Sequence, residues 1–226
     1  MDSTLSAKRW FAVGIGALTL SGLLSLVLVF ARAPVISEWI TDPLFARRCL
    51  VVHVNLAMFV WLLALIASLF HLIPRTAPGA SPPVDASGLA VAGMILFVMS
   101  GGLPDVPPVL SNYIPVLDSG LFFVGMGLVA LALAMTFATG RVGSTTHRPD
   151  TPVRPVLPPS ARIGLKFAGA AFLITCLTLL ITLWRIPPDL HPDYYYETLF
   201  WGAGHVLQFV NVAGMISVWC VLAYQL

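Results

Sequence analysis

Six apolar stretches, each about as long as a lipid bilayer is thick, dominate this sequence of 226 residues. A helix needs roughly 20 predominantly apolar residues to cross the hydrocarbon core. The third stretch is the weakest, because Gly101-Gly102-Leu103-Pro104 ends it early. The sequence therefore predicts an all-α integral membrane protein, a single domain of six transmembrane helices. The expected spans are about 10–31, 49–74, 87–103, 119–139, 163–184 and 198–225.

The composition excludes most other classes of protein. Charged residues make up 10% of the chain and apolar residues 58%, whereas a soluble domain carries about 25% charged residues. A net charge of +2 is too small to indicate nucleic-acid binding. Cys49, Cys176 and Cys220 are far apart, so they predict neither a disulfide framework nor a cysteine-based metal site. The segments 75–87 and 140–162 are rich in Pro, Ser, Thr and Gly and are expected to be loops.

The distribution of Lys and Arg predicts the orientation of the chain. If the N-terminus is cytoplasmic, the inner segments hold eight of the twelve basic residues and the outer segments hold four. Basic residues favour the cytoplasmic side, so both termini are expected there, in a bacterial inner (cytoplasmic) membrane with lipid around the helices. No signal peptide is evident, because the first apolar run follows Lys8-Arg9 and lacks a clear cleavage site.

Histidines are the main ionisable groups within the expected spans. His53 lies about 6 Å below the outer start of the second span, and His205 lies about two turns below Glu197 in the sixth. The two imidazoles therefore have similar expected depths, as a haem or metal layer requires. His71 is about 27 Å from His53 along the same helix, too far to share a site with it. For His53, an interhelical hydrogen bond in place of a ligand role stays open as the alternative. For His71, such a hydrogen bond is the expected role.

The surroundings of His205 indicate close packing. Gly202 and Gly204 remove side chains beside the histidine, which lets a neighbouring helix or a flat ring approach. Gln208 and Asn211 add polar groups within two turns of His205. This stretch of helix is therefore not expected to face lipid around its whole circumference. Ordinary small-residue packing is the structural alternative. His147 and His191 lie in polar segments and are expected to be exposed.

Two segments resemble the haem-copper oxidase superfamily. The segment LFWGAGHVLQFVNVAGMIS (199–217) is similar to helix six of the catalytic subunit. The segment RRCLVVHVNLAMFVWLLALIASLFHLIP (47–74) is similar to helix two, as it occurs in nitric oxide reductase and in bacterial oxidases of the cytochrome c oxidase subunit I type. The resemblance covers the first six helices in order and is generic between these two segments.

The resemblance implies a role for individual residues. It makes His53 an axial ligand of a low-spin, b-type haem and His205 one of the ligands of a copper ion, with Trp201 lining the copper pocket. Arg185, from its charge and its depth at the outer end of the fifth span, is expected to pair with a haem propionate. The chain departs from the family at Phe209, where oxidases have a cross-linked tyrosine, and at Leu207, where they have a glutamate.

The length of the chain leaves three accounts open. The family's catalytic subunit has about twelve helices, and its second half supplies the remaining haem and copper ligands. This sequence is expected to be a half-length subunit whose other half is a separate chain, an incomplete version of a longer protein, or a descendant that kept only the fold. No ligand set is complete within it, so no residue is assigned as catalytic in this chain alone.

The leading functional hypothesis is a half-length haem-copper oxidase-like subunit in respiratory electron transfer. It would take part in reducing oxygen or nitric oxide, with metal sites completed by other membrane subunits and electrons from an external donor. The alternative is a non-catalytic six-helix scaffold of a larger membrane complex, holding at most one haem, pigment or lipid.

Overall fold

A helix occupies each of the six stretches for which the sequence predicts a span. The computed structural model describes residues 3–73, 84–138 and 157–226. Short elements join the helices: the single-turn helix α2 (Pro34–Ser37) and the antiparallel strands β1 (Pro108–Val109) and β2 (Val116–Leu117). The long helical elements are α1 (Ser3–Phe30), α3 (Phe45–Asn55), η1 (Leu56–Trp61), α4 (Leu62–His71), α5 (Ser87–Gly101), α6 (Gly120–Ala138), α7 (Pro159–Arg185) and α8 (Pro192–Gln225).

Among the described residues, five helices are long and apolar enough to cross a membrane: α1, the continuous helix Phe45–His71, α6, α7 and α8. The sixth, α5, has 15 residues and a length of about 22 Å at 1.5 Å per residue, which is less than a hydrocarbon core of about 30 Å. The expected early end of this stretch is confirmed, because α5 stops at Gly101.

Several helices begin outside the predicted spans. α7 and α8 start at Pro159 and Pro192, residues that suit a first helical turn because their missing N–H has no partner there. The predicted spans marked only apolar residues, whereas a helix continues into polar flanks as long as its backbone bonds are made. The second span also holds a feature that the sequence does not predict. Its helix changes to π-helical hydrogen bonding over η1, immediately after Asn55.

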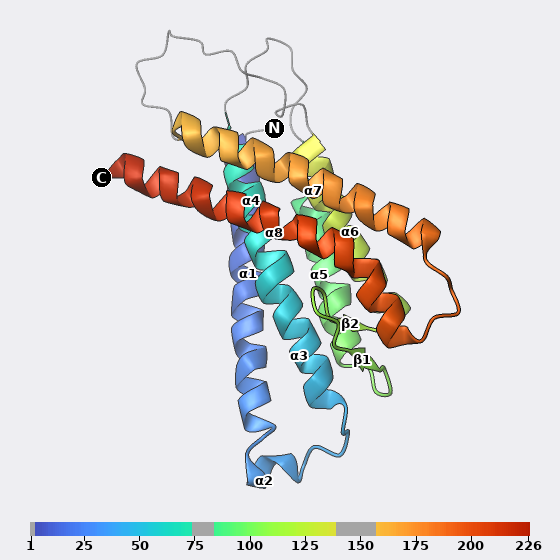
Figure 1. Ribbon diagram of the computed structural model, residues 1–226. Coiled ribbons are helices and arrows are strands. Elements are labelled where there is room, and N and C mark those ends of the chain that lie inside the picture. Colours follow the sequence, from blue (N-terminus) through green and yellow to red (C-terminus); the bar gives the residue numbers. More distant parts are fainter. Residues whose placement is uncertain (1–2, 74–83, 139–156) are drawn as a thin grey trace.

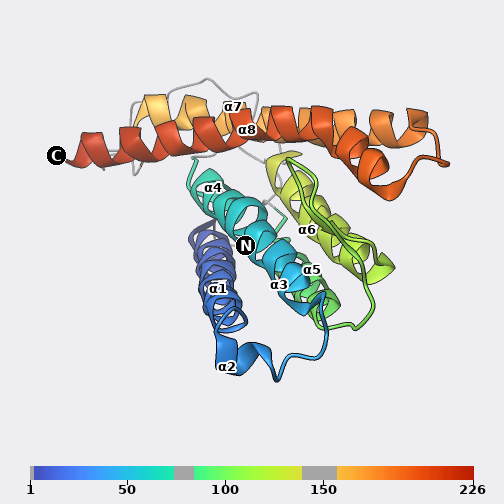
Figure 2. The same ribbon diagram turned by 60° about the horizontal axis from the view of Figure 1, so that its bottom comes forward.

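The helices form a group of four and a crossing pair. α1, the continuous helix α3–η1–α4, α5 and α6 lie in one group, and α7 and α8 run antiparallel across its end (Figures 1 and 2). A row of aromatic side chains joins the two parts: the Phe70 and Phe137 rings are 5.2 Å apart, and the Phe137 and Phe172 rings 5.4 Å apart. The pair α7–α8 is therefore anchored on α4 and α6.

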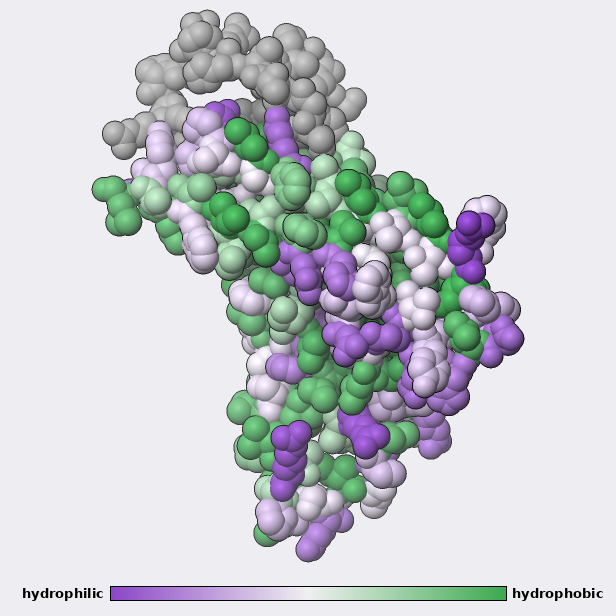
Figure 3. Space-filling model, in the orientation of Figure 1, coloured by the Kyte–Doolittle hydropathy of each residue, from purple (hydrophilic) through white to green (hydrophobic). Residues whose placement is uncertain are grey.

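The surface is largely apolar. Leu23, Leu180 and Trp219 are each more than half exposed, as expected of side chains that face lipid. Apolar residues spread over much of the face in Figure 3, and hydrophilic residues gather in its middle, over α8 and the β1–β2 segment, and toward its lower end. The described chain is therefore a helical protein with the surface of an integral membrane protein.

The contact between α5 and α6 depends on two glycines. A Cβ atom at Gly125 would lie 2.7 Å from the Gly93 carbonyl oxygen and 2.7 Å from the Phe97 nitrogen. Both neighbours are backbone atoms, so neither helix can yield without moving. Small residues allow this close approach of helices in membranes.

We expect Gly125→Ala to lower the free energy of unfolding by about 1–3 kcal/mol, because the added methyl group forces α5 and α6 apart. Gly127→Ala is the matched control on the same helix, since nothing lies within 4 Å of its Cβ position. Thermal unfolding of the detergent-solubilised variants measures the difference. Equal melting temperatures for the two variants would contradict this packing.

Candidate functional site

His53 is held by the neighbouring helix α1. Its Nδ1 lies 2.8 Å from the Ser21 carbonyl oxygen and 3.0 Å from the Ser21 hydroxyl oxygen. The same hydroxyl donates to the His53 carbonyl oxygen at 3.1 Å. Ser21 is buried, so this contact ties α1 to α3 within the helix group. The interhelical hydrogen bond expected as the alternative is present, and it uses only one of the two ring nitrogens of His53. The role of His53 as a ligand stays a prediction.

The partner of Nδ1 decides the tautomer of His53. A carbonyl oxygen can only accept, so Nδ1 carries the proton, and in the neutral ring Nε2 then keeps its lone pair. No hydrogen bond reaches Nε2 from the described residues. A metal-binding histidine commonly donates its other ring N–H to a carbonyl, which fixes the ring and makes the ligating nitrogen more basic. The residues around His53 therefore fit a histidine that would ligate a metal ion through Nε2.

His205 has a different environment, because both its ring nitrogens are engaged. Nδ1 lies 2.7 Å from the Trp201 carbonyl oxygen, one turn earlier in α8. By the same reasoning Nδ1 donates and Nε2 accepts. The Tyr113 hydroxyl therefore donates a hydrogen bond to Nε2 at 2.8 Å. Copper needs a free imidazole lone pair, so this arrangement does not fit a copper ligand unless the bond to Tyr113 opens.

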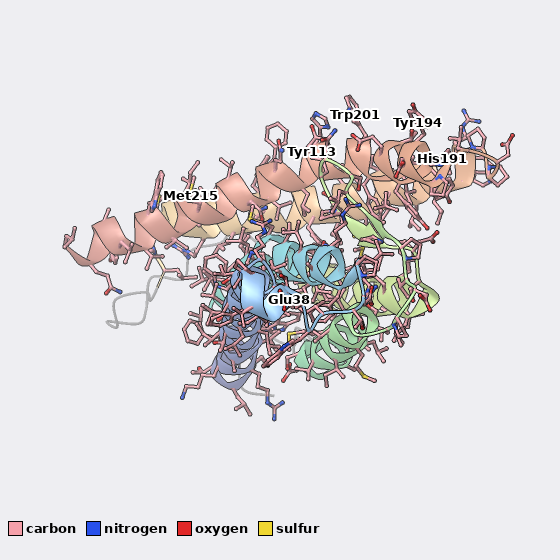
Figure 4. The ribbon with its side chains drawn as sticks, turned by 90° about the horizontal axis from the view of Figure 1, so that it is seen from below. Glu38, Tyr113, His191, Tyr194, Trp201 and Met215 are labelled. Carbon is pink, nitrogen blue, oxygen red and sulfur yellow. The ribbon has the colours of Figure 1, made fainter. Side chains whose placement is uncertain are left out.

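The close approach expected beside His205 is confirmed, and the approaching group is a tyrosine ring. A Cβ atom at Gly204 would lie 2.5 Å from the Tyr113 Cβ. The Tyr113 and His205 rings are 4.5 Å apart. Trp201 stands on the same part of α8, with its ring 4.2 Å from that of His205 (Figure 4). The ring comes from the segment between α5 and α6 and not from a neighbouring helix, which sequence spacing alone does not indicate.

Polar contacts fasten this segment to two helices. The Asn112 backbone N–H and side-chain amide donate to the Glu197 carboxylate at 2.9 and 2.7 Å. The Tyr196 hydroxyl donates to Asp118 at 2.6 Å. From the other side, Asn55 donates to the Pro115 carbonyl oxygen at 2.7 Å. The segment therefore bridges α3 and α8, with Val116 and Leu117 buried and Leu110 and Asn112 exposed.

A groove of about 290 Å³ lies between α3–η1 and α8, beneath this segment. Its lining includes Val54 and Gly204, the sequence neighbours of the two histidines, whereas neither histidine is part of it. The structure thus places His53 against α1 and His205 against Tyr113. No described contact brings the two imidazoles together, and their common depth stays a prediction.

The other predicted residues lie apart from His53. Arg185 is exposed at the end of α7, with its guanidinium 5.7 Å from the centre of the Trp184 ring. Figures 1 and 2 place this end of α7 away from α1 and α3, so its role toward a haem propionate stays a prediction. His71 is buried at the end of α4. His191 is exposed as expected, and His147 lies outside the described residues.

Arg48 is a buried cation that the sequence analysis missed. It is 1% exposed, pairs with Asp42 and donates from Nε to the Gly101 carbonyl oxygen at 3.2 Å. The hydrogen bond from Arg48 holds the pKa of Asp42 below its ordinary value. Nη1 is buried without a partner among the described residues. Arg47 and Arg48 are adjacent in sequence, so composition does not show which of the two is buried. The helical repeat does, because it places Arg48 on the same face as the buried Val52 and Asn55.

Within the described residues, no three His, Cys, Asp or Glu side chains gather into a metal site. Any copper bound by His205 therefore needs ligands from elsewhere, as the resemblance implies.

Comparison with known proteins finds two relatives, each of which aligns with nearly the whole of this chain. An uncharacterised protein of Rickettsia prowazekii (strain Madrid E) is 27% identical over 241 aligned residues, which cover 96% of this chain and 46% of that protein. An uncharacterised protein of Aquifex aeolicus (strain VF5) is 26% identical over 215 residues, which cover 94% of this chain and 52% of that protein. The chain thus spans about half the length of these curated relatives. No protein-family model and no solved structure matches it.

We expect Tyr113→Phe to expose His205, because the substitution removes the hydroxyl that fills Nε2. Diethylpyrocarbonate reacts with free imidazole nitrogens, so the modification of His205 should become several-fold faster, as followed by peptide mass spectrometry. Tyr224→Phe, a similar change at an exposed position near the end of α8, is the control. An unchanged rate at His205 in Tyr113→Phe would show that this hydrogen bond does not protect the ring.

Proposed function

We propose that this chain is a haem-binding membrane subunit of the haem-copper oxidase type, corresponding to half of a catalytic unit. The observation that carries the proposal is the His53 site. A buried serine on α1 holds the Nδ1 proton, and Nε2 keeps its lone pair without a partner among the described residues. The two segments that resemble helices two and six of the family also support it.

The proposed haem is of the b type and is ligated by His53, and it supplies one-electron iron chemistry when bound. The residues of this chain bind and orient it. The Ser21 carbonyl oxygen accepts a hydrogen bond from Nδ1, which would leave the lone pair of Nε2 to ligate the iron. A further iron ligand would come from outside this chain. The relatives, about twice as long, have enough sequence for another membrane half, and the proposal assigns the missing ligands to such a half.

Copper at His205 is the second part of the proposal, and it requires a change in the Tyr113 segment. Tyr113 must release Nε2 before that nitrogen can bind a metal. The proposed reaction, reduction of oxygen or nitric oxide with electrons from an external donor, belongs to the assembled respiratory complex and not to this chain alone.

A non-catalytic scaffold is the second candidate, and the contacts of His205 favour it. Both of its nitrogens are satisfied within the protein, as in a structural histidine. In this alternative the six helices serve a larger complex and hold at most one haem, pigment or lipid.

The absorbance of the purified chain tests the haem site. We expect a reduced-minus-oxidised spectrum with the α-band of a b-type haem, and we expect His53→Ala to remove this band because the axial nitrogen is lost. His191→Ala, at an exposed histidine, should leave the spectrum unchanged. A folded wild-type chain whose spectrum shows no haem band would exclude the proposal and leave the scaffold.

The proposed topology has six crossings, with α5 among them and both termini in the cytoplasm. Fusions of green fluorescent protein to either terminus should fluoresce in bacterial cells, and alkaline phosphatase fused after Pro107 should be active, because residues 104–118 face the periplasm. Inactive phosphatase at this position, together with active phosphatase at either terminus, would reverse the orientation. Active phosphatase at the C-terminus alone would instead give an odd number of crossings.

A further inference from the structure

Another groove, of about 390 Å³, lies between α1 and the beginning of α5. Arg9 and Ser87 line one end of it, and the rest of the lining is mostly apolar, with Val13, Val91 and Met94 among the walls. Arg9 immediately precedes the first apolar stretch of the sequence and Ser87 begins the third, so this end is expected at the level of the lipid headgroups. Met94 is seven residues beyond Ser87, about 10 Å further along the helix. The groove therefore runs from a polar end at the expected membrane surface toward the hydrocarbon.

Arg9 supplies the positive charge at the polar end. Its Nη1 donates to the Asp85 carboxylate at 2.6 Å, and no hydrogen bond within the described residues uses its other N–H groups. The Arg9 side chain is 52% exposed, whereas that of Asp85 is 4% exposed. The Ser87 backbone N–H and hydroxyl also donate to Asp85, at 3.1 and 2.6 Å. The carboxylate is thus covered and fixes the arginine, and the guanidinium is the charge that this end of the groove presents.

Gly88 leaves space in the groove. A Cβ atom at this position would have nothing within 4 Å, and the backbone of Gly88 is not in the left-handed region. Neither helix packing nor backbone conformation therefore requires a glycine here. Gly88 lines the groove, so a larger side chain at this position would occupy space that the glycine leaves open.

The two ends of the groove differ in the chemistry that they can bind. The donors of an arginine match the oxygens of a phosphate group, which accept hydrogen bonds and carry the opposite charge. The apolar walls suit a flexible hydrocarbon chain. An unfilled groove loses dispersion contacts along its lining, and the acyl chains of the bilayer are close enough to restore them. A free phosphate ion would use Arg9 alone and leave the apolar part of the groove empty.

We infer that this groove binds a phospholipid of net negative charge, such as phosphatidylglycerol, with its phosphate on Arg9 and an acyl chain along the α1–α5 wall. A zwitterionic lipid brings a positive group close to the arginine, which weakens its attraction to the phosphate. The site is therefore selective for the anionic headgroup. This inference goes beyond the proposed function and needs neither haem nor copper.

Native mass spectrometry of the purified full chain in detergent tests the inference. The chain is titrated with phosphatidylglycerol and, separately, with phosphatidylcholine that has the same acyl chains. We expect the first phosphatidylglycerol to bind about three- to fivefold more tightly, the range that a partly exposed ion pair provides. Equal affinity for the two lipids, or no lipid retained at all, would overturn the inference.

Two substitutions test the headgroup contact. Arg9→Gln should bring the affinities for the two lipids together, because the positive charge is lost. Lys8→Gln removes the neighbouring basic residue, which is exposed and does not line the groove, and should keep the wild-type preference. Arg9→Lys keeps the charge and should keep most of the preference. It separates the loss of charge in Arg9→Gln from the loss of the side chain that pairs with Asp85.

A third substitution tests the apolar part without touching a charge. Gly88→Leu should lower the affinity for both lipids at least about threefold, because the leucine fills the groove. Gly22→Leu is the matched control on α1: nothing lies within 4 Å of its Cβ position and it does not line the groove. Thermal unfolding of each variant shows that it is folded. A preference for phosphatidylglycerol that survives both Arg9→Gln and Gly88→Leu would place the lipid elsewhere and overturn the inference. Because these measurements need no haem, their failure is distinct from failure of the His53 spectrum.

Discussion

In a chain with so few charges, the polar groups inside the protein have to find partners on other helices, and these pairings organise the structure. Lipid offers no hydrogen bonds, so a buried hydroxyl, amide or imidazole is satisfied by protein or carries a free-energy cost. The Ser68 hydroxyl on α4 donates to the Ala7 carbonyl oxygen on α1 at 2.8 Å, and Ser21 ties the same helix to α3. Asn55 anchors the segment before α6. Apolar packing brings the helices together, and these few contacts select which faces meet.

The same constraint explains why the two histidines differ. His53 shares one nitrogen with a backbone carbonyl oxygen on α1 and keeps the other as a lone pair. His205 lies where the β1–β2 segment crosses α8, and the tyrosine carried by that segment uses its remaining nitrogen. A histidine with one committed nitrogen is poised to bind a metal ion, whereas a histidine with two committed nitrogens serves as a structural link until one bond opens. The haem part of the proposed function therefore needs no rearrangement at His53, whereas the copper part needs the bond between Tyr113 and His205 to open.

Sequence reasoning succeeded where a single helix carries the information. The positions of the six helices, the early end of α5 at Gly101 and the exposure of His191 follow from local composition. It also anticipated that Gly204 permits a close approach, since a residue without Cβ leaves room for a neighbouring helix or ring. It missed the burial of Arg48 and the contact of Tyr113 with His205, because each depends on a neighbour more than 40 residues away in the chain. It also missed the π-helical turn after Asn55, which is a local change of helical hydrogen bonding.

By itself, the sequence determined that the protein is helical and suited to a membrane, since apolar runs of this length are stable only as helices in lipid. It also determined that histidines and amides are the polar groups available inside. The tertiary structure decided what these groups do. Which nitrogen of His53 remains free, which residue caps His205 and which carbonyl oxygen Asn55 reaches all depend on how α1, α3 and α8 pack, and on a segment of irregular backbone between α5 and α6. Hydrogen bonds are short-ranged and directional, so chemistry that rests on them is set only when helices distant in sequence come into contact.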